Sequence, residues 1–155
     1  MAETAAGGLI SSSLTAVPGA SAWFLGGVVP YAALAKARWL DLSVDRLTGA
    51  GTVSEAAAQR MAAAARAALG ATWGLAETGI AGPQTGRRST KPAGLVSIAV
   101  DGPHAESRER LTGLPGRVEN QAAFTRFALE LLLESLRLAP RTPPAPALRN
   151  TPSPG

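Results

Sequence analysis

The feature that most constrains the fold is a glycine-rich loop between two strand-like segments near the middle of the chain. The loop begins with Thr-Gly-Ile-Ala-Gly-Pro at residues 78–83 and ends with Lys-Pro-Ala-Gly at residues 91–94. A short apolar run precedes it at residues 73–76, and residues 95–100 have the apolar, β-branched content of a strand. Glycines where a strand stops leave backbone N–H groups accessible, because no side chain blocks a ligand. The pattern predicts two strands joined by a candidate binding loop.

The same loop carries three cations, Arg87, Arg88 and Lys91. Cationic side chains beside accessible backbone N–H groups favour an anion such as a phosphate as the ligand. The alternative is a surface loop whose basic tip is only solvated, and composition alone leaves both interpretations open. The loop is therefore a candidate phosphate site whose role depends on what else in the chain supports it.

The length and composition indicate one globular domain. The chain has 155 residues, which suffices for a single core. It contains no apolar run near the ~20 residues of a membrane span, and its first residues do not resemble a signal peptide. It has no cysteine and one histidine, His104, so disulfides, thiol nucleophiles and cysteine or histidine metal sites are not expected. We therefore expect a cytoplasmic protein without a membrane segment or a bound metal.

The net charge of +4 and the isoelectric point of 10.6 invite a nucleic-acid interpretation. Three of these charges, Arg137, Arg141 and Arg149, lie after the last predicted helix, where no acidic residue occurs. The remainder shows no basic stripe interleaved with aromatic residues, which strand-binding proteins use. Nucleic acid is not the expected main partner. We expect an ordered domain over residues 1–137 and a proline-rich disordered tail over residues 138–155.

Capping and turn residues predict the remaining elements. Ser54 is a good N-cap and Gly70 a typical helix stop, so we expect a helix over residues 55–69. Residues 105–112 place charged residues on one side, as in an edge strand. We find no internal repeat. Further predicted elements are helices over residues 8–17, 32–40 and 115–136, strands over residues 26–31 and 94–101, and a turn or short helix over residues 45–49.

The start of the first predicted helix is a second candidate anion site. It follows Gly7 and Gly8, where free backbone donors and the helix dipole favour a negative charge. The alternative is an ordinary glycine turn before a helix. Other residues also have structural alternatives: His104 is expected in a turn, and the three tryptophans are expected in the core or an interface.

The sequence of the central loop resembles the signature of the CinA C-terminal domain family. Three further blocks are similar to that family: Ala-Glu-Thr-Ala-Ala-Gly-Gly at residues 2–8, residues 20–31, and Val-Ser-Glu at residues 53–55. The resemblance extends from residue 2 to about residue 136. It implies a three-layer α/β/α fold around a central mixed sheet. In the family a helix and a strand precede the first block, so we expect this chain to lack the family's first helix and strand.

The resemblance also implies a function. Characterised members hydrolyse the carboxamide of nicotinamide mononucleotide to the acid, with release of ammonia and without a metal or other cofactor, in pyridine nucleotide salvage. Members often associate as dimers, so a homodimer is implied as well. Amide hydrolysis requires a nucleophile, a proton acceptor and donors for the developing oxyanion. The expected small-molecule partner is therefore a pyridine nucleotide.

Individual residues acquire roles by the same resemblance. The nucleophilic serine of the family falls on Thr4, and the assisting tyrosine and lysine fall on Tyr31 and Lys36. A lysine can act as a base if burial lowers its pKa. The residues that would shape the nucleotide pocket are Gly7, Gly8, Thr78, Gly79, Gly82 and Gln121.

Several positions depart from the family pattern. Threonine adds a methyl group beside the reacting hydroxyl at Thr4. The family's Cys-Thr pair is Ala5-Ala6, its Ser-Asn pair is Ala32-Ala33, and its arginine before Gln121 is Asn120. A second hypothesis therefore stays open, a nucleotide-binding or scaffold protein that has lost catalysis. Without the resemblance, Thr4, Tyr31 and Lys36 are a loop threonine, a strand-end aromatic and a solvated lysine.

Overall fold

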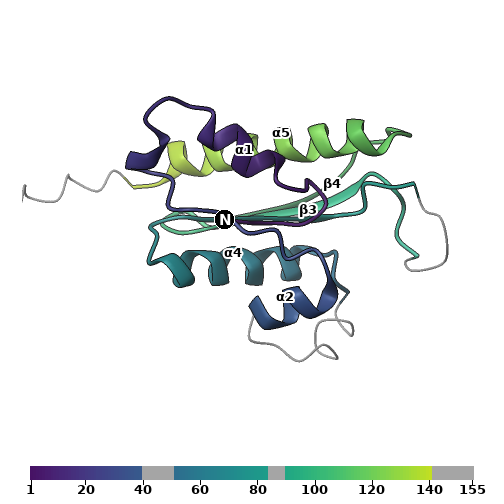
Figure 1. Cartoon of the computed structure of the whole chain (residues 1–155), viewed down its shortest axis with the longest axis horizontal. Coiled ribbons are helices and arrows are strands. Elements are labelled where there is room, and N and C mark those ends of the chain that lie inside the picture. Colours follow the sequence, from purple (N-terminus) through teal and green to yellow (C-terminus); the bar gives the residue numbers. More distant parts are fainter. Residues whose placement is uncertain (40–50, 84–89, 141–155) are drawn as a thin grey trace, which may run out of the picture.

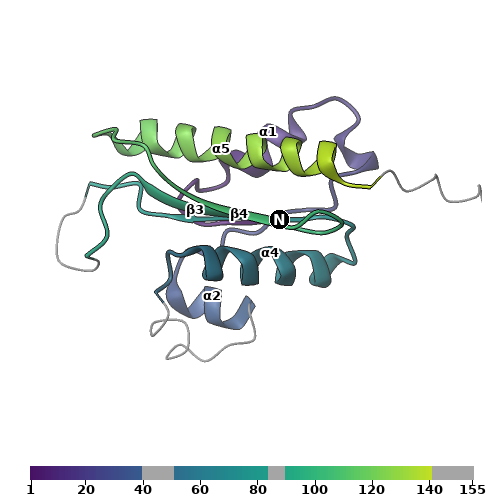
Figure 2. The same cartoon turned by 180° about the vertical axis from the view of Figure 1, so that it is seen from behind.

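The computed structural model describes residues 1–39, 51–83 and 90–140. The helices in these residues are α1 (Leu9–Thr15), α2 (Ala33–Trp39), α4 (Glu55–Leu69) and α5 (Arg117–Leu138), with a short 3-10 helix η1 (Ala20–Ala22) after α1. Helices α1 and α5 cover one face of a central sheet, and α4 and α2 lie on the other side (Figure 1, Figure 2). The three-layer α/β/α prediction is confirmed.

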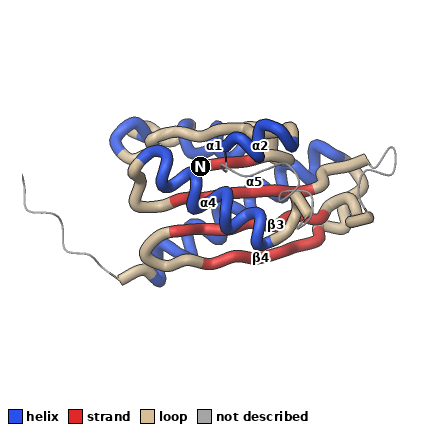
Figure 3. The backbone as a smooth tube through the Cα atoms, turned by 90° about the horizontal axis from the view of Figure 1, so that it is seen from below, coloured by secondary structure: helices blue, strands red, loops and turns tan. Residues whose placement is uncertain are grey.

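The sheet contains β1 (Ala2–Glu3), β2 (Gly74–Gly79), β3 (Leu95–Asp101) and β4 (Glu106–Leu111), side by side in that order (Figure 3). β1 runs parallel to β2, and the other neighbours are antiparallel. The sheet is therefore mixed, as expected. Strands lie on both sides of the glycine-rich loop and β4 lies at an edge, as predicted. However, β2 continues through Thr78 and Gly79, which were predicted to begin the loop.

The opposite edge of the sheet differs from the prediction. β1 contains only Ala2 and Glu3, so a stub of strand is present directly at the first family-like block. The strand predicted over residues 26–31 is wrong, because only Val28 forms a bridge, to Ala2. The N–H of Glu3 donates to the Val28 carbonyl over 3.0 Å. A two-residue strand can form only a short hydrogen-bond ladder with this segment, and Pro30 has no N–H that could extend the ladder.

Helix α4 matches its prediction residue for residue. The Ser54 hydroxyl accepts a hydrogen bond from the N–H of Ala57 at 3.2 Å, which satisfies one of the unpaired donors of the first turn. Gly70 ends the helix with a φ of 59°, in the left-handed region that glycine adopts readily. Helix α5 begins at Arg117, two residues after the predicted start at Pro115.

The two helix layers meet the sheet through side chains of different size. The α4 layer is built on Met61 and small residues: Ala2, Ala58, Ala62, Ala65, Ala76 and Ala99. Gly74 permits the close approach of α4, because a Cβ there would lie 2.1 Å from the carbonyl oxygen of Ala62. The α1 and α5 layer uses larger residues, including Ile10, Val96, Ile98, Phe124 and Leu131.

The remaining structural predictions have mixed outcomes. Trp73 and Trp39 pack partly buried against the two core layers, whereas Trp23 is half-exposed. His104 lies in the turn between β3 and β4, as predicted. No helix among the described residues is long and apolar enough to span a membrane.

Some predictions concern parts of the chain that lie outside the described residues. These are the cations Arg87 and Arg88 of the loop, the turn or short helix at residues 45–49, and the tail beyond residue 140.

Candidate functional site

The candidate site is built on a short repeat that the sequence analysis missed. Ala-Glu-Thr occurs at residues 2–4 and again at residues 76–78. Ala2 and Glu3 of β1 pair in register with Ala76 and Glu77 of β2, and Thr4 follows directly after β1. Ala2 and Ala76 face α4. Because side chains alternate along a strand, the threonines share that face and the glutamates point toward α1 and α5.

On the α4 side, two hydroxyls and an amine converge. The Thr4 hydroxyl lies 3.4 Å from Thr78 Oγ1, and Lys36 Nζ lies 3.4 Å from the same oxygen. The Thr78 hydroxyl donates to the Thr52 carbonyl at 2.7 Å. Thr4, Thr78 and Lys36 are all buried. The 3.4 Å contacts are long for hydrogen bonds.

Lys36 reaches this cluster from α2 with little exposed surface. Burial lowers the pKa of its amine because the charged form loses hydration, and the negative charge of Glu77 opposes that shift. A lowered pKa increases the fraction of neutral amine at neutral pH. The arrangement can therefore supply a hydroxyl and a base, the pair that acyl transfer requires.

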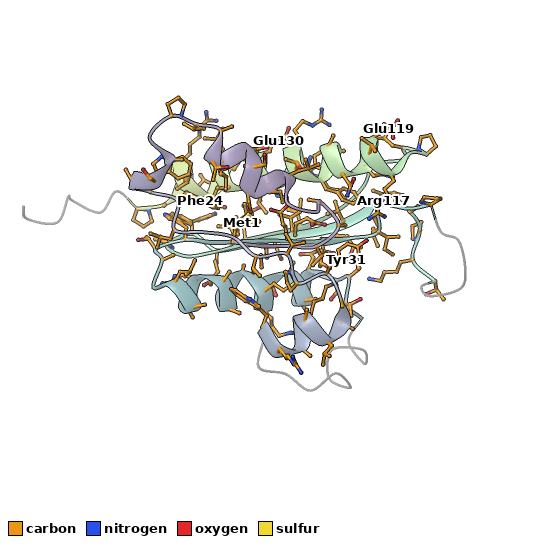
Figure 4. All side chains as sticks on the ribbon, in the orientation of Figure 1. Met1, Phe24, Tyr31, Arg117, Glu119 and Glu130 are labelled. Carbon is orange, nitrogen blue, oxygen red and sulfur yellow. The ribbon has the colours of Figure 1, made fainter. Side chains whose placement is uncertain are left out.

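Tyr31 stands apart from this cluster. Its side chain is exposed, and its hydroxyl accepts a hydrogen bond from Arg117 Nη2 at 2.7 Å. Nη1 of the same arginine donates to the Gly82 carbonyl at 2.9 Å. Figure 4 shows Tyr31 and Arg117 at the same end of the sheet. Sequence reasoning missed Arg117, although its place in the first turn of the last helix, four residues before Gln121, was an available signal.

Two neighbouring residues of α5 hold the turns that come after β1 and β2. Gln121 Nε2 donates to the Ala5 carbonyl at 2.9 Å. Asn120 is fully buried, and its Nδ2 donates to the Ala81 carbonyl at 3.0 Å. Gly7 packs beneath Gln121, since a Cβ on Gly7 would lie 3.2 Å from Nε2. The structure thus brings Gln121 and Gly7 together. The side chains of Asn120 and Gln121 hold the two turns from the α5 side of the sheet.

The N–H groups that were predicted to bind an anion at Gly7 and Gly8 form hydrogen bonds within the chain. The carboxylate of Glu3 accepts hydrogen bonds from the N–H of Gly8 at 2.9 Å, of Ile10 at 3.1 Å and of Ser11 at 2.9 Å. It also accepts the Ser11 hydroxyl at 2.7 Å. The N–H of Gly7 donates to the Thr4 carbonyl. A charge of the protein's own therefore caps α1 in place of an external anion.

The central loop uses its first glycines for packing. A Cβ on Gly79 would lie 2.9 Å from both the Leu95 carbonyl and the Phe124 ring. The N–H of Ile80 donates to the same Leu95 carbonyl at 2.8 Å, so this donor is occupied. Gly82 has a φ of 77°, which favours glycine. The predicted role of these glycines in binding a phosphate is untested.

Glu77 is the second functional candidate that sequence reasoning missed. Its side chain is fully buried, and Oε2 accepts the N–H groups of Thr4 and Ala6, each at 3.0 Å. Burial raises the pKa of Glu77 to about 7, and the charge of Glu3 adds to the rise, while the two N–H bonds and Lys36 oppose it. The available signal was an acidic residue directly after an apolar run, in the second copy of Ala-Glu-Thr. Among residues 1–39, 51–83 and 90–140, no cluster of three or more acidic, cysteine or histidine residues could hold a metal.

The chain is similar in sequence to curated proteins that share one name. A "CinA-like protein" of Anaeromyxobacter dehalogenans is 45% identical over 139 residues, which cover 88% of this chain and 33% of the relative. A "CinA-like protein" of Prochlorococcus marinus is 40% identical over 137 residues, 88% of this chain and 32% of the relative. The chain thus spans about a third of the length of these curated relatives.

Solved structures agree with the fold. The competence damage-inducible protein A (ComA) of Klebsiella pneumoniae matches with a TM-score of 0.81 and 30% identity, covering 88% of this chain and 84% of that one. The competence/damage inducible protein CihA of Agrobacterium tumefaciens matches with a TM-score of 0.78 and 37% identity, covering 87% and 82%. The family described as "CinA C-terminal domain" matches residues 1–136. The chain belongs to the CinA C-terminal domain family.

Proposed function

We propose that the protein hydrolyses the carboxamide of nicotinamide mononucleotide to nicotinate mononucleotide and ammonia. The observation that carries the proposal is the convergence of the Thr4 hydroxyl and the Lys36 amine on Thr78 Oγ1. This cluster adjoins Gly79, the first glycine of the family-like loop. A hydroxyl and a buried amine are the nucleophile and the proton acceptor that amide hydrolysis without a metal requires.

In the proposed reaction the Thr4 oxygen attacks the carboxamide carbon, and its proton passes to neutral Lys36. Thr78 Oγ1 lies between the two groups and can relay that proton by turning its own O–H from Thr52 toward Nζ. Lys36 then protonates the departing nitrogen as the C–N bond breaks, and ammonia leaves. Water cleaves the resulting ester by the reverse proton path.

The nucleotide end of the substrate needs a cation, because the backbone donors beside Gly8 are occupied by Glu3. Arg117 is placed for this role: its guanidinium connects Tyr31 to the Gly82 turn at the surface. A guanidinium suits a phosphate because its planar donors match two oxygens. Tyr31 would line the entrance, and Gln121 would hold the turn that comes after Thr4.

The proposal extends to the setting of the reaction. It places the protein in pyridine nucleotide salvage in the cytoplasm, with the catalytic domain in residues 1–137, a tail in residues 138–155, and a second copy of the chain as its partner.

A catalytically lapsed nucleotide-binding or scaffold protein is the second candidate. The observation that favours it is that Glu77 takes the N–H groups of both Thr4 and Ala6, so these donors do not face a developing oxyanion. The methyl group of Thr4 also stiffens the reacting side chain.

One experiment separates the two candidates. Purified wild-type protein is incubated with nicotinamide mononucleotide, ammonia and nicotinate mononucleotide are measured, and nucleotide binding is followed by calorimetry. Hydrolysis by the wild type and by Thr4→Ser, with loss in Thr4→Val, supports the amidohydrolase. Binding without product in all three proteins supports the lapsed protein, and absence of both rejects both candidates.

A further inference from the structure

The Glu77 carboxylate is bonded asymmetrically. Oε2 accepts two backbone N–H groups, whereas Oε1 accepts no hydrogen bond from the residues that the structure describes. Oε1 lies against Gly79, where a Cβ would approach it to 3.0 Å. Strand alternation directs Glu77 toward α5 and its neighbour Thr78 toward α4. The carboxylate thus acts from the sheet face opposite to the hydroxyl cluster.

The two N–H groups belong to the turn that presents the Thr4 hydroxyl. Glu77 binds the first and last residues of this turn, Thr4 and Ala6, and Gln121 binds the carbonyl of Ala5 between them. The turn is therefore held by β2 on one side and by α5 on the other. Any displacement of the turn changes the 3.4 Å separation of the Thr4 and Thr78 hydroxyls.

We infer that Glu77 is a positioning residue, whose Oε2 clamps the turn at residues 4–6 and thereby sets where the Thr4 hydroxyl stands relative to Thr78. The catalytic meaning of the clamp rests on the proposed function. The clamp itself is a property of the protein without substrate, and this permits a test that does not depend on turnover.

The clamp is expected to respond to pH. Burial raises the pKa of Glu77 to about 7, and two charged groups also act on it: Glu3 on β1 raises the pKa, and Lys36 of α2, on the other side of the sheet, lowers it. Two uncharged groups also lie near Gly79, which Glu77 contacts: the Leu95 carbonyl from β3 and the Phe124 ring from α5. An ionised carboxylate accepts N–H bonds more strongly than a neutral acid does. The turn is therefore held most tightly above about pH 7.

Two substitutions at this position isolate the clamp. Glu77→Gln keeps an oxygen for the two N–H groups but cannot titrate, and Glu77→Val removes the acceptor. Glu134→Gln is the matched control, because Glu134 is a half-exposed residue near the far end of α5 that pairs with Arg108. The first measurement is the pH dependence, from 5.5 to 9, of the amide nuclear magnetic resonance shifts of Thr4 and Ala6. The second is kcat and KM for ammonia release from nicotinamide mononucleotide.

In the wild type and in Glu134→Gln, we expect both amide resonances to titrate with a midpoint near pH 7, and in Glu77→Gln to stay flat. Glu77→Val should lower kcat about a hundredfold with little change in KM, as expected when a reacting group is misplaced. Glu77→Gln should retain most of kcat at high pH and lose the pH dependence near 7. If Glu77→Val does not fold, the Glu77→Gln spectra still decide the matter.

Amide resonances that do not titrate in the wild type, or that titrate equally in Glu77→Gln, would overturn the inference. A rise in KM with unchanged kcat in Glu77→Val would also overturn it, because that pattern indicates substrate binding. If the wild type releases no ammonia while the amides titrate as expected, the proposed function fails and the clamp stands.

Discussion

The two Ala-Glu-Thr segments have the same residues and adjacent places in the sheet, yet their glutamates have different surroundings. Glu3 receives four donors from the start of α1, whereas Glu77 receives two on a single oxygen. The difference arises from the element that comes after each tripeptide. A helix begins shortly after Thr4 and offers its first N–H groups, while Thr78 leads into a loop toward β3.

The threonines of the two segments differ as well. Thr78 Oγ1 contacts Thr4, Lys36 and the Thr52 carbonyl, so it is the centre of the cluster. Within the described part of the chain, the Thr4 hydroxyl has one hydrogen-bond partner, Thr78. The comparison teaches that two identical tripeptides form different hydrogen bonds, according to the neighbours of each copy. In the proposed function, Thr4 is the nucleophile and Thr78 relays its proton.

Removing each hydroxyl in turn is the strongest test of the different roles proposed for Thr4 and Thr78. Thr4→Val should reduce ammonia release by more than about a thousandfold, because it removes the proposed nucleophile, while Thr78→Val should cause a smaller loss. Thr4→Ser should retain activity, since it keeps the hydroxyl and removes the methyl group. The rates are measured with nicotinamide mononucleotide. Activity that persists in Thr4→Val but disappears in Thr78→Val would reverse the roles of the two threonines.

Removal of the amine should have the next largest effect. Lys36→Met should lower kcat about a hundredfold or more, because it removes the proposed general base. Burial lowers the pKa of Lys36, and only the neutral amine accepts a proton, so the wild-type rate should rise with pH as this amine loses its proton. Arg38→Met, which removes an exposed cation from the same helix, is the control. An unchanged pH profile in Lys36→Met would exclude Lys36 as the base.

The two glutamates should differ in how their substitution changes stability and its pH dependence. Because the pKa of Glu77 is about 7 in the folded protein and 4.5 ordinarily, the folded state binds this proton more tightly. Its contribution to stability is therefore complete below about pH 4.5 and is lost as the pH rises to about 7, and the difference corresponds to about 3 kcal/mol. Glu77→Gln should remove this pH dependence. Glu3→Gln should lower the free energy of unfolding by about 3 kcal/mol, because charged acceptors form stronger hydrogen bonds.

Chemical denaturation at pH 5 and pH 8 provides the measurement for both glutamates. Destabilisation of similar size in Glu3→Gln and Glu77→Gln at pH 8 would show that the two carboxylates are equivalent. The distinction drawn from their hydrogen bonds would then be wrong.

The smallest expected effect concerns substrate affinity. Arg117→Ala should raise KM about tenfold with little change in kcat, because it removes a cation proposed to bind the phosphate before and during reaction alike. Arg126→Ala on the exposed side of the same helix should leave both constants unchanged. A fall in kcat without a change in KM would assign Arg117 to the chemical step.

The sequence predicted the elements whose signals are local. Ser54, Gly70 and the alanine-rich run between them determine α4 through capping and propensity. The prediction of a strand around Val28 was wrong because strand pairing there depends on the length of β1, which the segment itself does not determine. The resemblance suggested Lys36 and Thr4, and the structure brings them together. Glu77 and Arg117 were missed because their roles depend on register and on the course of α5.

The alanine residues between α4 and the sheet influence the hydroxyl cluster from a distance. Thr52, whose carbonyl receives the Thr78 hydroxyl, stands three residues before the first residue of α4. A larger residue at Ala58 or Ala62 would have to lift the whole helix, and Thr52 would travel with it. The small size of these alanines therefore fixes how far Thr52 stands from Thr78 in the sheet.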